Sequence, residues 1–185
     1  MASPRTLLII DIQRDYFPGG AYPLVEPEAA AEAARRVLDS FRESGDPVIH
    51  MKHVWDAPDA EFMRPGTEGI EIHPTVQPAD GELVLEKESP NSFLDTPLEE
   101  ELRKRDPAEL VVAGMMSSMC VDATVRAAAD LGFSARVVHD ACAAPDLEFN
   151  GLDVPGAAVH AAFMAALADG YADVTSAAEL LGEPG

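Results

Sequence analysis

Apolar positions along the chain alternate between two patterns. Short, largely apolar runs, as expected for strands buried on both faces, occur at residues 6–10, 47–54, 83–85, 110–113, 135–139 and 172–175. Helices are predicted between them over residues 27–44, from residue 97 onward, and over residues 120–131, 155–168 and 176–181. Strands that alternate with helices predict an α/β protein, namely a three-layer α/β/α domain with a six-stranded, mostly parallel sheet.

Long loops connect some of these elements. Residues 55–78 contain four prolines and two glycines, show no clear hydrophobic period, and form a connection long enough to cover a site. Because loops after strands face the ligand site in this kind of sheet, we expect Trp55, Phe62 and Phe17 to line a substrate pocket. Ordinary loop packing is the alternative for these three side chains. Residues Gly151–Asp153 are also predicted to form a loop.

Length and composition set the class of protein. A chain of 185 residues, 47% of them hydrophobic, suits a single globular domain spanning residues 1–185. The formal net charge is −20, from 33 acidic and 13 basic residues, and the acidic residues are spread along the chain. Such a surface repels phosphates, which argues against nucleic acid as a partner and favours a solvated exterior. Salt adaptation and ordinary solubility both explain this acidity.

Cysteine use and the N-terminal pattern indicate where the protein functions. Only Cys120 and Cys142 occur, too few for a disulfide framework, so a reducing, cytoplasmic setting is expected. The apolar run Leu7–Ile10 is too short for a signal-peptide core, and no segment is long and apolar enough to span a membrane. A redox pair of the two cysteines is a weak alternative, because they lie on separate predicted elements.

Three ionisable residues lie at the predicted carboxyl ends of strands, where parallel sheets bind ligands. Asp11 follows the first strand, Lys87 the third, and Cys120 the turn after the fourth. At the first turn of a helix, Cys120 would meet unpaired N–H groups and the positive end of the helix dipole, which lower a thiol pKa. A carboxylate can take the thiol proton, and an ammonium can hold both groups in their charged forms. The alternatives are a loop-capping Asp11, a surface Lys87 and a buried, inert Cys120.

Four segments resemble signature blocks of the isochorismatase-like cysteine hydrolases. They are DIQRDYF from Asp11, PGTEGIEIHP from Pro65, EKESPNSF from Glu86 and AGMMSSMCVDATVRAAADLGF from Ala113. The resemblance runs in order over nearly the whole chain. It implies an α/β/α fold with six parallel strands and a catalytic triad of Asp11, Lys87 and Cys120.

The resemblance also implies finer features of the site. A cis peptide bond would fall between Met115 and Met116. The backbone N–H groups of Met116 and Cys120 would form an oxyanion hole, which stabilises negative charge on a reacting carbonyl oxygen. Members of this family commonly form dimers or tetramers, so a homo-oligomer is expected.

Members of the family cleave amides, ureido compounds or the enol ether of isochorismate. The triad favours hydrolysis of a small amide or related C–N substrate through a thioester at Cys120, with Asp11 moving protons. Acid-catalysed enol-ether hydrolysis, with Asp11 as the acid and no need for a thiol, is the alternative. A further alternative is a non-catalytic binding protein on the same scaffold, against which the intact triad argues.

No metal or other cofactor is predicted. Nicotinamidases of this superfamily bind a metal through Asp-x-His and a later histidine after the second strand, whereas this chain reads KHVWDAP there. His53 and Asp56 have the wrong order and spacing for that set. We therefore interpret His50, His53 and His73 as polar or packing residues.

Overall fold

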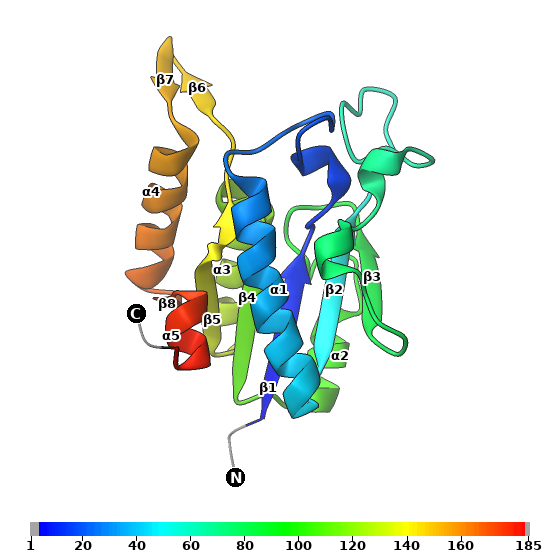
Figure 1. Cartoon of the computed structure of the whole chain (residues 1–185), viewed down its shortest axis with the longest axis vertical. Helices are drawn as coiled ribbons and strands as arrows, with labels where there is room; N and C mark the ends of the chain where they lie inside the picture. Colours follow the sequence, from blue (N-terminus) through cyan, green and yellow to red (C-terminus); the bar gives the residue numbers. More distant parts are fainter. Residues whose placement is uncertain (1–3, 184–185) are drawn as a thin grey trace.

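A fully parallel six-stranded sheet forms the middle layer of the protein (Figure 1). The computed structural model describes residues 4–183. The strands are β1 (Arg5–Ile10), β2 (Val48–His53), β3 (Leu83–Lys87), β4 (Glu109–Met115), β5 (Ala135–Ala143) and β8 (Ala172–Thr175). Their order is β3-β2-β1-β4-β5-β8, and every neighbouring pair is parallel. The predicted α/β fold with a six-stranded sheet is confirmed.

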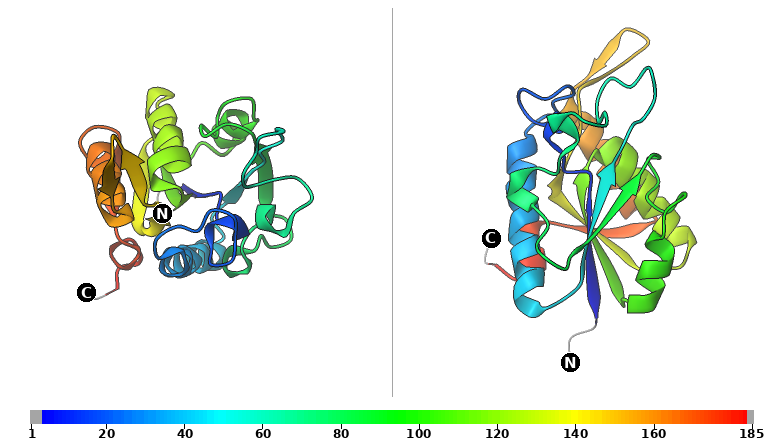
Figure 2. Two further views of the ribbon diagram at one scale, coloured as in Figure 1. Left: turned by 90° about the horizontal axis from the view of Figure 1, so that it is seen from above. Right: turned by 90° about the vertical axis from the view of Figure 1, so that its right-hand side faces the viewer.

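Helices cover both faces of the sheet, as the views in Figure 2 show. They are α1 (Pro27–Ser44), α2 (Leu98–Arg105), α3 (Asp122–Asp130), α4 (Gly156–Ala168) and α5 (Ala177–Leu181). Residues of α1 and α5 pack in one apolar cluster, and residues of α2, α3 and α4 in another. Side chains of β1 alternate between them, with Leu7 and Ile9 in the first and Leu8 and Ile10 in the second. All four are at most 2% exposed, so each contributes roughly 1.5–3 kcal/mol of hydrophobic stabilisation.

Several helix ends follow capping signals in the sequence. Gly45 ends α1 in the left-handed conformation, with φ 74°. Ser176 and Glu179 form a capping box at the start of α5, in which each side chain accepts a hydrogen bond from the other's backbone N–H. At α2 the N-cap residue is Pro97, and the Leu98 N–H donates to the hydroxyl of the preceding Thr96 (3.3 Å). These caps satisfy backbone groups that a helix end leaves unpaired.

A two-stranded antiparallel hairpin, β6 (Leu147–Phe149) and β7 (Leu152–Val154), projects from the molecule beyond α4 (Figure 1). The prediction of a loop at Gly151–Asp153 was therefore wrong. The hairpin turn is Asn150-Gly151, whose φ values are both positive (54° and 74°), and this pair of residues favours tight turns. Strands this short carry too few residues for an alternating pattern to reveal them.

The helix after β4 also begins differently from the prediction. A π-helical turn, η4 (Ser117–Val121), precedes α3, so Cys120 lies in this wider turn and not at the first turn of an α-helix. The loops contain three 3-10 turns, η1 (Arg14–Tyr16), η2 (Glu68–Ile70) and η3 (Pro74–Val76). Each helix formed by residues 4–183 is too short or too polar to cross a membrane. The cytoplasmic setting stays a prediction.

Gly114 in β4 pairs with Ile10 and has no room for a side chain. A Cβ there would lie 2.1 Å from the Ile10 carbonyl oxygen, at φ +148°. We expect Gly114→Ala to lower the free energy of unfolding by about 3 kcal/mol or more, because backbone must move. Gly45→Ala, with open space and φ +74°, is the control and should cost about 1 kcal/mol. Urea unfolding measures both, and equal losses would contradict the expected clash.

Candidate active site

Asp11, Lys87 and Cys120 meet at the carboxyl edge of the sheet. The Lys87 ammonium lies 2.6 Å from the Asp11 carboxylate, and both side chains are fully buried. A carboxylate oxygen of Asp11 and the sulfur of Cys120 lie within 4.8 Å of each other, and Cys120 is only 4% exposed. The structure therefore brings together the three ionisable residues that follow or end separate strands.

Backbone pairing explains why these side chains converge. Asp11 follows β1, an inner strand, and its N–H donates to the carbonyl of Met51 in β2 (3.1 Å). Its φ of 50° is left-handed, a conformation that is uncommon outside glycine and gathers at functional sites. Lys87 is the last residue of β3 and pairs with His53, the last residue of β2. Cys120 lies in η4, which follows β4 after one connecting residue.

Burial and the ion pair set the protonation of the site. Burial alone would lower the pKa of Lys87, but the Asp11 carboxylate and the Cys120 sulfur outweigh it and raise that pKa. The pKa of Cys120 is also raised, first by burial and then by the Asp11 charge, while Lys87 acts in the opposite direction. The expected lowering of the thiol pKa was therefore wrong, because desolvation dominates. At neutral pH the resting group is a thiol beside a carboxylate–ammonium pair.

His53 contacts this ion pair directly. Its Nδ1 lies 3.0 Å from Lys87 Nζ, which also donates to the Ser89 carbonyl (3.0 Å). Together with the ion pair to Asp11, these two contacts surround the ammonium with groups that favour its charged form. Burial and the Lys87 charge lower the pKa of His53, so its ring is neutral and Nδ1 accepts. The sequence interpretation of His53 as a polar or packing residue did not locate this contact, which depends on the β2–β3 register.

Gln13 fixes the backbone around His53. Its side-chain amide accepts from the His53 N–H (2.8 Å) and donates to the carbonyls of His53 (2.9 Å) and Ile70 (2.7 Å). Because Gln13 is fully buried, these bonds tie the end of β2 to the long loop in a dry environment. A glutamine in a loop carries no periodic signal, which is why sequence reasoning missed its role.

A metal ion does not fit the residues at this site. Asp11, His53 and Cys120 form the one converging group of metal-ligating side chains within the described chain. Lys87 Nζ contacts both Asp11 and His53, so an ammonium already occupies the position of a cation between them. Asp56, the other acidic candidate after β2, is exposed and lies outside this group.

The chain turns sharply between β4 and η4. The Met115–Met116 peptide bond is cis, at the position that the resemblance implies. The Met116 carbonyl accepts hydrogen bonds from the N–H groups of Met119 (3.1 Å) and Val121 (3.2 Å). These two bonds bracket Cys120 and fix the backbone that carries its thiol.

A cavity of about 560 Å³ opens beside this turn. Its lining includes Tyr22, Trp55, Glu61, Phe62, Met116 and Ser118. Trp55 and Phe62, two of the three aromatic side chains predicted to line a substrate pocket, line this cavity. Phe17 does not, because it is buried against His73, with ring centroids 3.7 Å apart, and lines a separate cavity of about 350 Å³. Tyr22, from the same loop as Phe17, faces the cavity instead and was missed.

Known proteins match nearly the whole chain. The model of the isochorismatase domain matches residues 5–179. The chain belongs to the isochorismatase family. This family membership accounts for the four sequence segments that resemble the family, and the protein is accordingly a hydrolase.

Individual members of the isochorismatase family show how closely this chain follows it. Isochorismatase family protein YddQ of Bacillus subtilis (strain 168) is 49% identical over 168 residues, which cover 91% of this chain and 93% of YddQ. The crystal structure of a protein assigned as an isochorismatase hydrolase from Oleispira antarctica has 48% identity and a TM-score of 0.93, over 98% of both chains. N-carbamoylsarcosine amidase from Thermoplasma acidophilum has 26% identity and a TM-score of 0.78, over 94% of this chain and 96% of that one.

Removing either charge beside Cys120 should shift its thiol pKa in opposite directions. Asp11→Asn removes the negative charge that raises this pKa, so the pKa should fall. Lys87→Met removes the positive charge that lowers it, so the pKa should rise. Titration of thiolate ultraviolet absorbance measures both, in a Cys142→Ala background that leaves a single thiol. Shifts in the same direction would contradict the electrostatics described here.

Proposed function

We propose that the protein hydrolyses a small amide or related C–N bond through a thioester on Cys120. The observation that carries this proposal is a buried sulfur within 4.8 Å of a carboxylate oxygen of Asp11, whose carboxylate also pairs with Lys87. Nucleophile, base and balancing cation are thus in one dry cluster. Similarity to an N-carbamoylsarcosine amidase supports chemistry at a C–N bond.

Asp11 is the proposed general base. As a substrate carbonyl approaches, its carboxylate takes the Cys120 proton and the sulfur attacks the carbonyl carbon. The backbone N–H groups of Met116 and Cys120 are proposed to donate to the developing oxyanion, with about 3 kcal/mol typical for one such donor. Asp11 then protonates the leaving nitrogen and activates the water that hydrolyses the thioester.

The raised thiol pKa fits this sequence of proton transfers. Before attack, the cluster holds a carboxylate, an ammonium and a neutral thiol. After transfer it holds a neutral carboxyl group, the same ammonium and an anionic sulfur, so its total charge is unchanged. Moving charge within a buried pair avoids creating a second unpaired ion, which desolvation would oppose. Lys87 is proposed to stabilise the anion on either partner.

The alternative enol-ether reaction would use Asp11 as an acid and leave Cys120 without a role. The position of the sulfur beside both charged groups favours its participation. A binding protein without activity would likewise have no use for this arrangement of thiol, base and cation. The amide reaction therefore accounts for more of the site than either alternative.

Replacement of Cys120 separates the two chemistries. Cys120→Ala should reduce ammonia release from small amides at least about 10³-fold, because no thioester can form. Asp11→Asn and Lys87→Ala should reduce it similarly. Cys142→Ala, the same change at the other buried cysteine, is the matched control and should retain turnover. Wild-type-like hydrolysis by Cys120→Ala would instead indicate a reaction that does not need the thiol.

Loss of one buried charge also affects folding, because removing one partner of such a pair typically costs about 3–5 kcal/mol. The double variant Asp11→Asn, Lys87→Met removes both charges and provides the control. It should be more stable than either single variant in thermal unfolding, yet remain inactive. Recovered activity in the double variant would show that the ion pair is structural only.

We propose further that the protein forms a homo-oligomer, a dimer or tetramer, through α4 and the hairpin. None of the 13 residues of α4 is charged, and most of its alanines are exposed. A helix that is apolar on all sides is usually covered. The hairpin adds Phe149 and Leu152, which are 72% and 68% exposed. In a chain of net charge −20, the uncharged α4 offers a face where two copies repel each other least.

A charge on the hairpin should therefore weaken self-association. We expect Phe149→Glu to lower the mass measured by light scattering at micromolar concentration, because an ion at an apolar contact must be desolvated. Leu94→Glu, at a 50% exposed position outside α4 and the hairpin, is the matched control and should leave the mass unchanged. A monomeric wild-type protein would contradict the proposed assembly.

A further inference from the structure

Aromatic rings form one wall of the 560 Å³ cavity beside the η4 turn that carries Cys120. Trp55 and Phe62 meet edge to face, with centroids 5.3 Å apart and an interplanar angle of 81°. Tyr22 stacks on Phe62, with ring centroids 4.9 Å apart and an interplanar angle of 29°. Such ring faces carry negative quadrupole charge and attract both flat apolar groups and cations. The wall therefore restricts the ligand to a flat or positively charged group.

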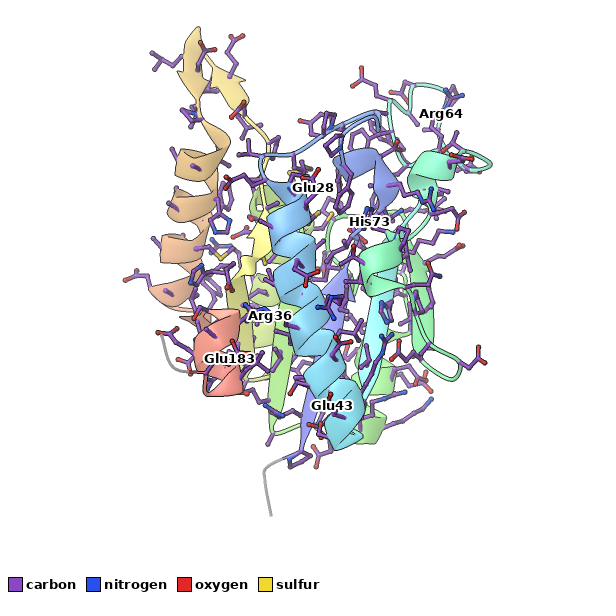
Figure 3. The ribbon with its side chains drawn as sticks, in the orientation of Figure 1. Glu28, Arg36, Glu43, Arg64, His73 and Glu183 are labelled. Carbon is purple, nitrogen blue, oxygen red and sulfur yellow. The ribbon has the colours of Figure 1, made fainter. Side chains whose placement is uncertain are left out.

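The charges around the cavity indicate which of the two, a flat apolar group or a cation, binds more favourably. Glu61 is the one charged side chain in the lining, and no lysine or arginine among the described residues lines it. The loop segment that carries Trp55 and Phe62 also bears the exposed Asp56 and Asp59. Arg64 follows three residues after Glu61 but stays outside the lining, and Figure 3 shows it on the outer part of the long loop. An anionic ligand would thus find no oppositely charged side chain in the lining, and a cationic one would find Glu61.

The rest of the protein adds negative charge farther from the cavity. The hairpin contributes Leu147 to the lining, and the next residue, Glu148, is exposed. With a net charge of −20, the long-range field of the protein attracts cations and repels anions before they reach the cavity. Local and long-range electrostatics therefore act in the same direction.

Ser118 supplies a polar group to the cavity from the η4 turn, which also carries Cys120. It lines the cavity two residues before Cys120 and is 9% exposed. Its hydroxyl has no hydrogen-bond partner within residues 4–183. Buried hydroxyls are rarely left unpaired, so this group is available to a ligand. The cavity thus has a hydrogen-bonding group from the η4 turn, which also carries Cys120, and an aromatic wall with Glu61 from the long loop.

We infer that the substrate is a small amide that carries a positively charged amino group, with the cation against the Trp55–Phe62 wall near Glu61 and the amide beside Ser118 and Cys120. This inference rests on the proposed amide hydrolysis and adds the class of amide. A dianionic enol ether would have its carboxylates among acidic and aromatic side chains. The same charges therefore disfavour the alternative substrate.

Tryptophan fluorescence reports on this cavity directly, because Trp55 is the single tryptophan of the chain. The test titrates the Cys120→Ala protein with three benzamides that differ in one para substituent: aminomethyl (cationic), methyl (neutral) and carboxylate (anionic). We expect a dissociation constant about tenfold lower for the cationic than for the neutral compound, which corresponds to the upper range of cation–π and carboxylate attraction. The anionic compound should bind weakest.

Glu61→Gln tests whether the carboxylate of Glu61 contributes to the preference for the cationic compound. It should reduce the preference for the cationic over the neutral compound about threefold, since the aromatic wall remains. Glu43→Gln removes the same charge from the C-terminal part of α1, at the far end of the molecule (Figure 3), and should leave the preference unchanged. Equal effects of the two variants would assign the preference to net charge alone and overturn the role of Glu61.

Turnover of the same three compounds by the wild-type protein separates this inference from the proposed function. Hydrolysis that depends on Cys120, combined with equal or tighter binding of the anionic compound, overturns the cationic class and leaves the amide chemistry standing. Ordered binding without any ammonia release overturns amide hydrolysis and supports the charge preference of the cavity. No fluorescence change with any compound overturns the assignment of this cavity as the substrate site.

Discussion

Two opposite charges buried at one edge of the sheet, Asp11 and Lys87, are the constraint on which the site depends. Neither ion could be buried alone without a penalty of several kcal/mol, so each requires the other. The remaining N–H groups of the ammonium require acceptors, which His53 and the Ser89 carbonyl provide. The same dry environment keeps the Cys120 thiol protonated until a base takes its proton. Packing, hydrogen bonding and proposed chemistry thus follow from one ion pair.

Much of this arrangement could be predicted from the sequence. The remaining features could not be predicted, for physical reasons. Strands buried on both faces leave apolar runs, so the residues that follow them, such as Asp11, can be located on the sheet edge. Contacts between strands depend on register, which no single run reveals. The sequence therefore indicated only a polar or packing role for His53 and not its contact with Lys87. Loop side chains obey no period, so Phe17 and Tyr22 could not be told apart. The thiol pKa depended on desolvation, which the position in a turn does not disclose.

Charge is distributed unevenly in this protein, and that distribution connects the fold with the proposed reaction. Inside the site, one carboxylate and one ammonium balance. Outside, the acidic excess gives a net charge of −20, while α4 has no charged residue. The cavity has aromatic rings and a single carboxylate, Glu61, in its lining. A long loop, a hairpin and the η4 turn build that cavity, so segments without regular pattern carry its selectivity.

The central claim is that the sulfur of Cys120 becomes covalently bonded to the acyl part of an amide. The most direct measurement is rapid acid quenching during turnover of a benzamide, followed by mass spectrometry of proteolytic peptides. We expect a transient benzoyl mass on the peptide that contains Cys120, absent from the peptide with Cys142 and from the Asp11→Asn protein. Product formation without any adduct on Cys120 at the shortest times, or an adduct confined to Cys142, would contradict it.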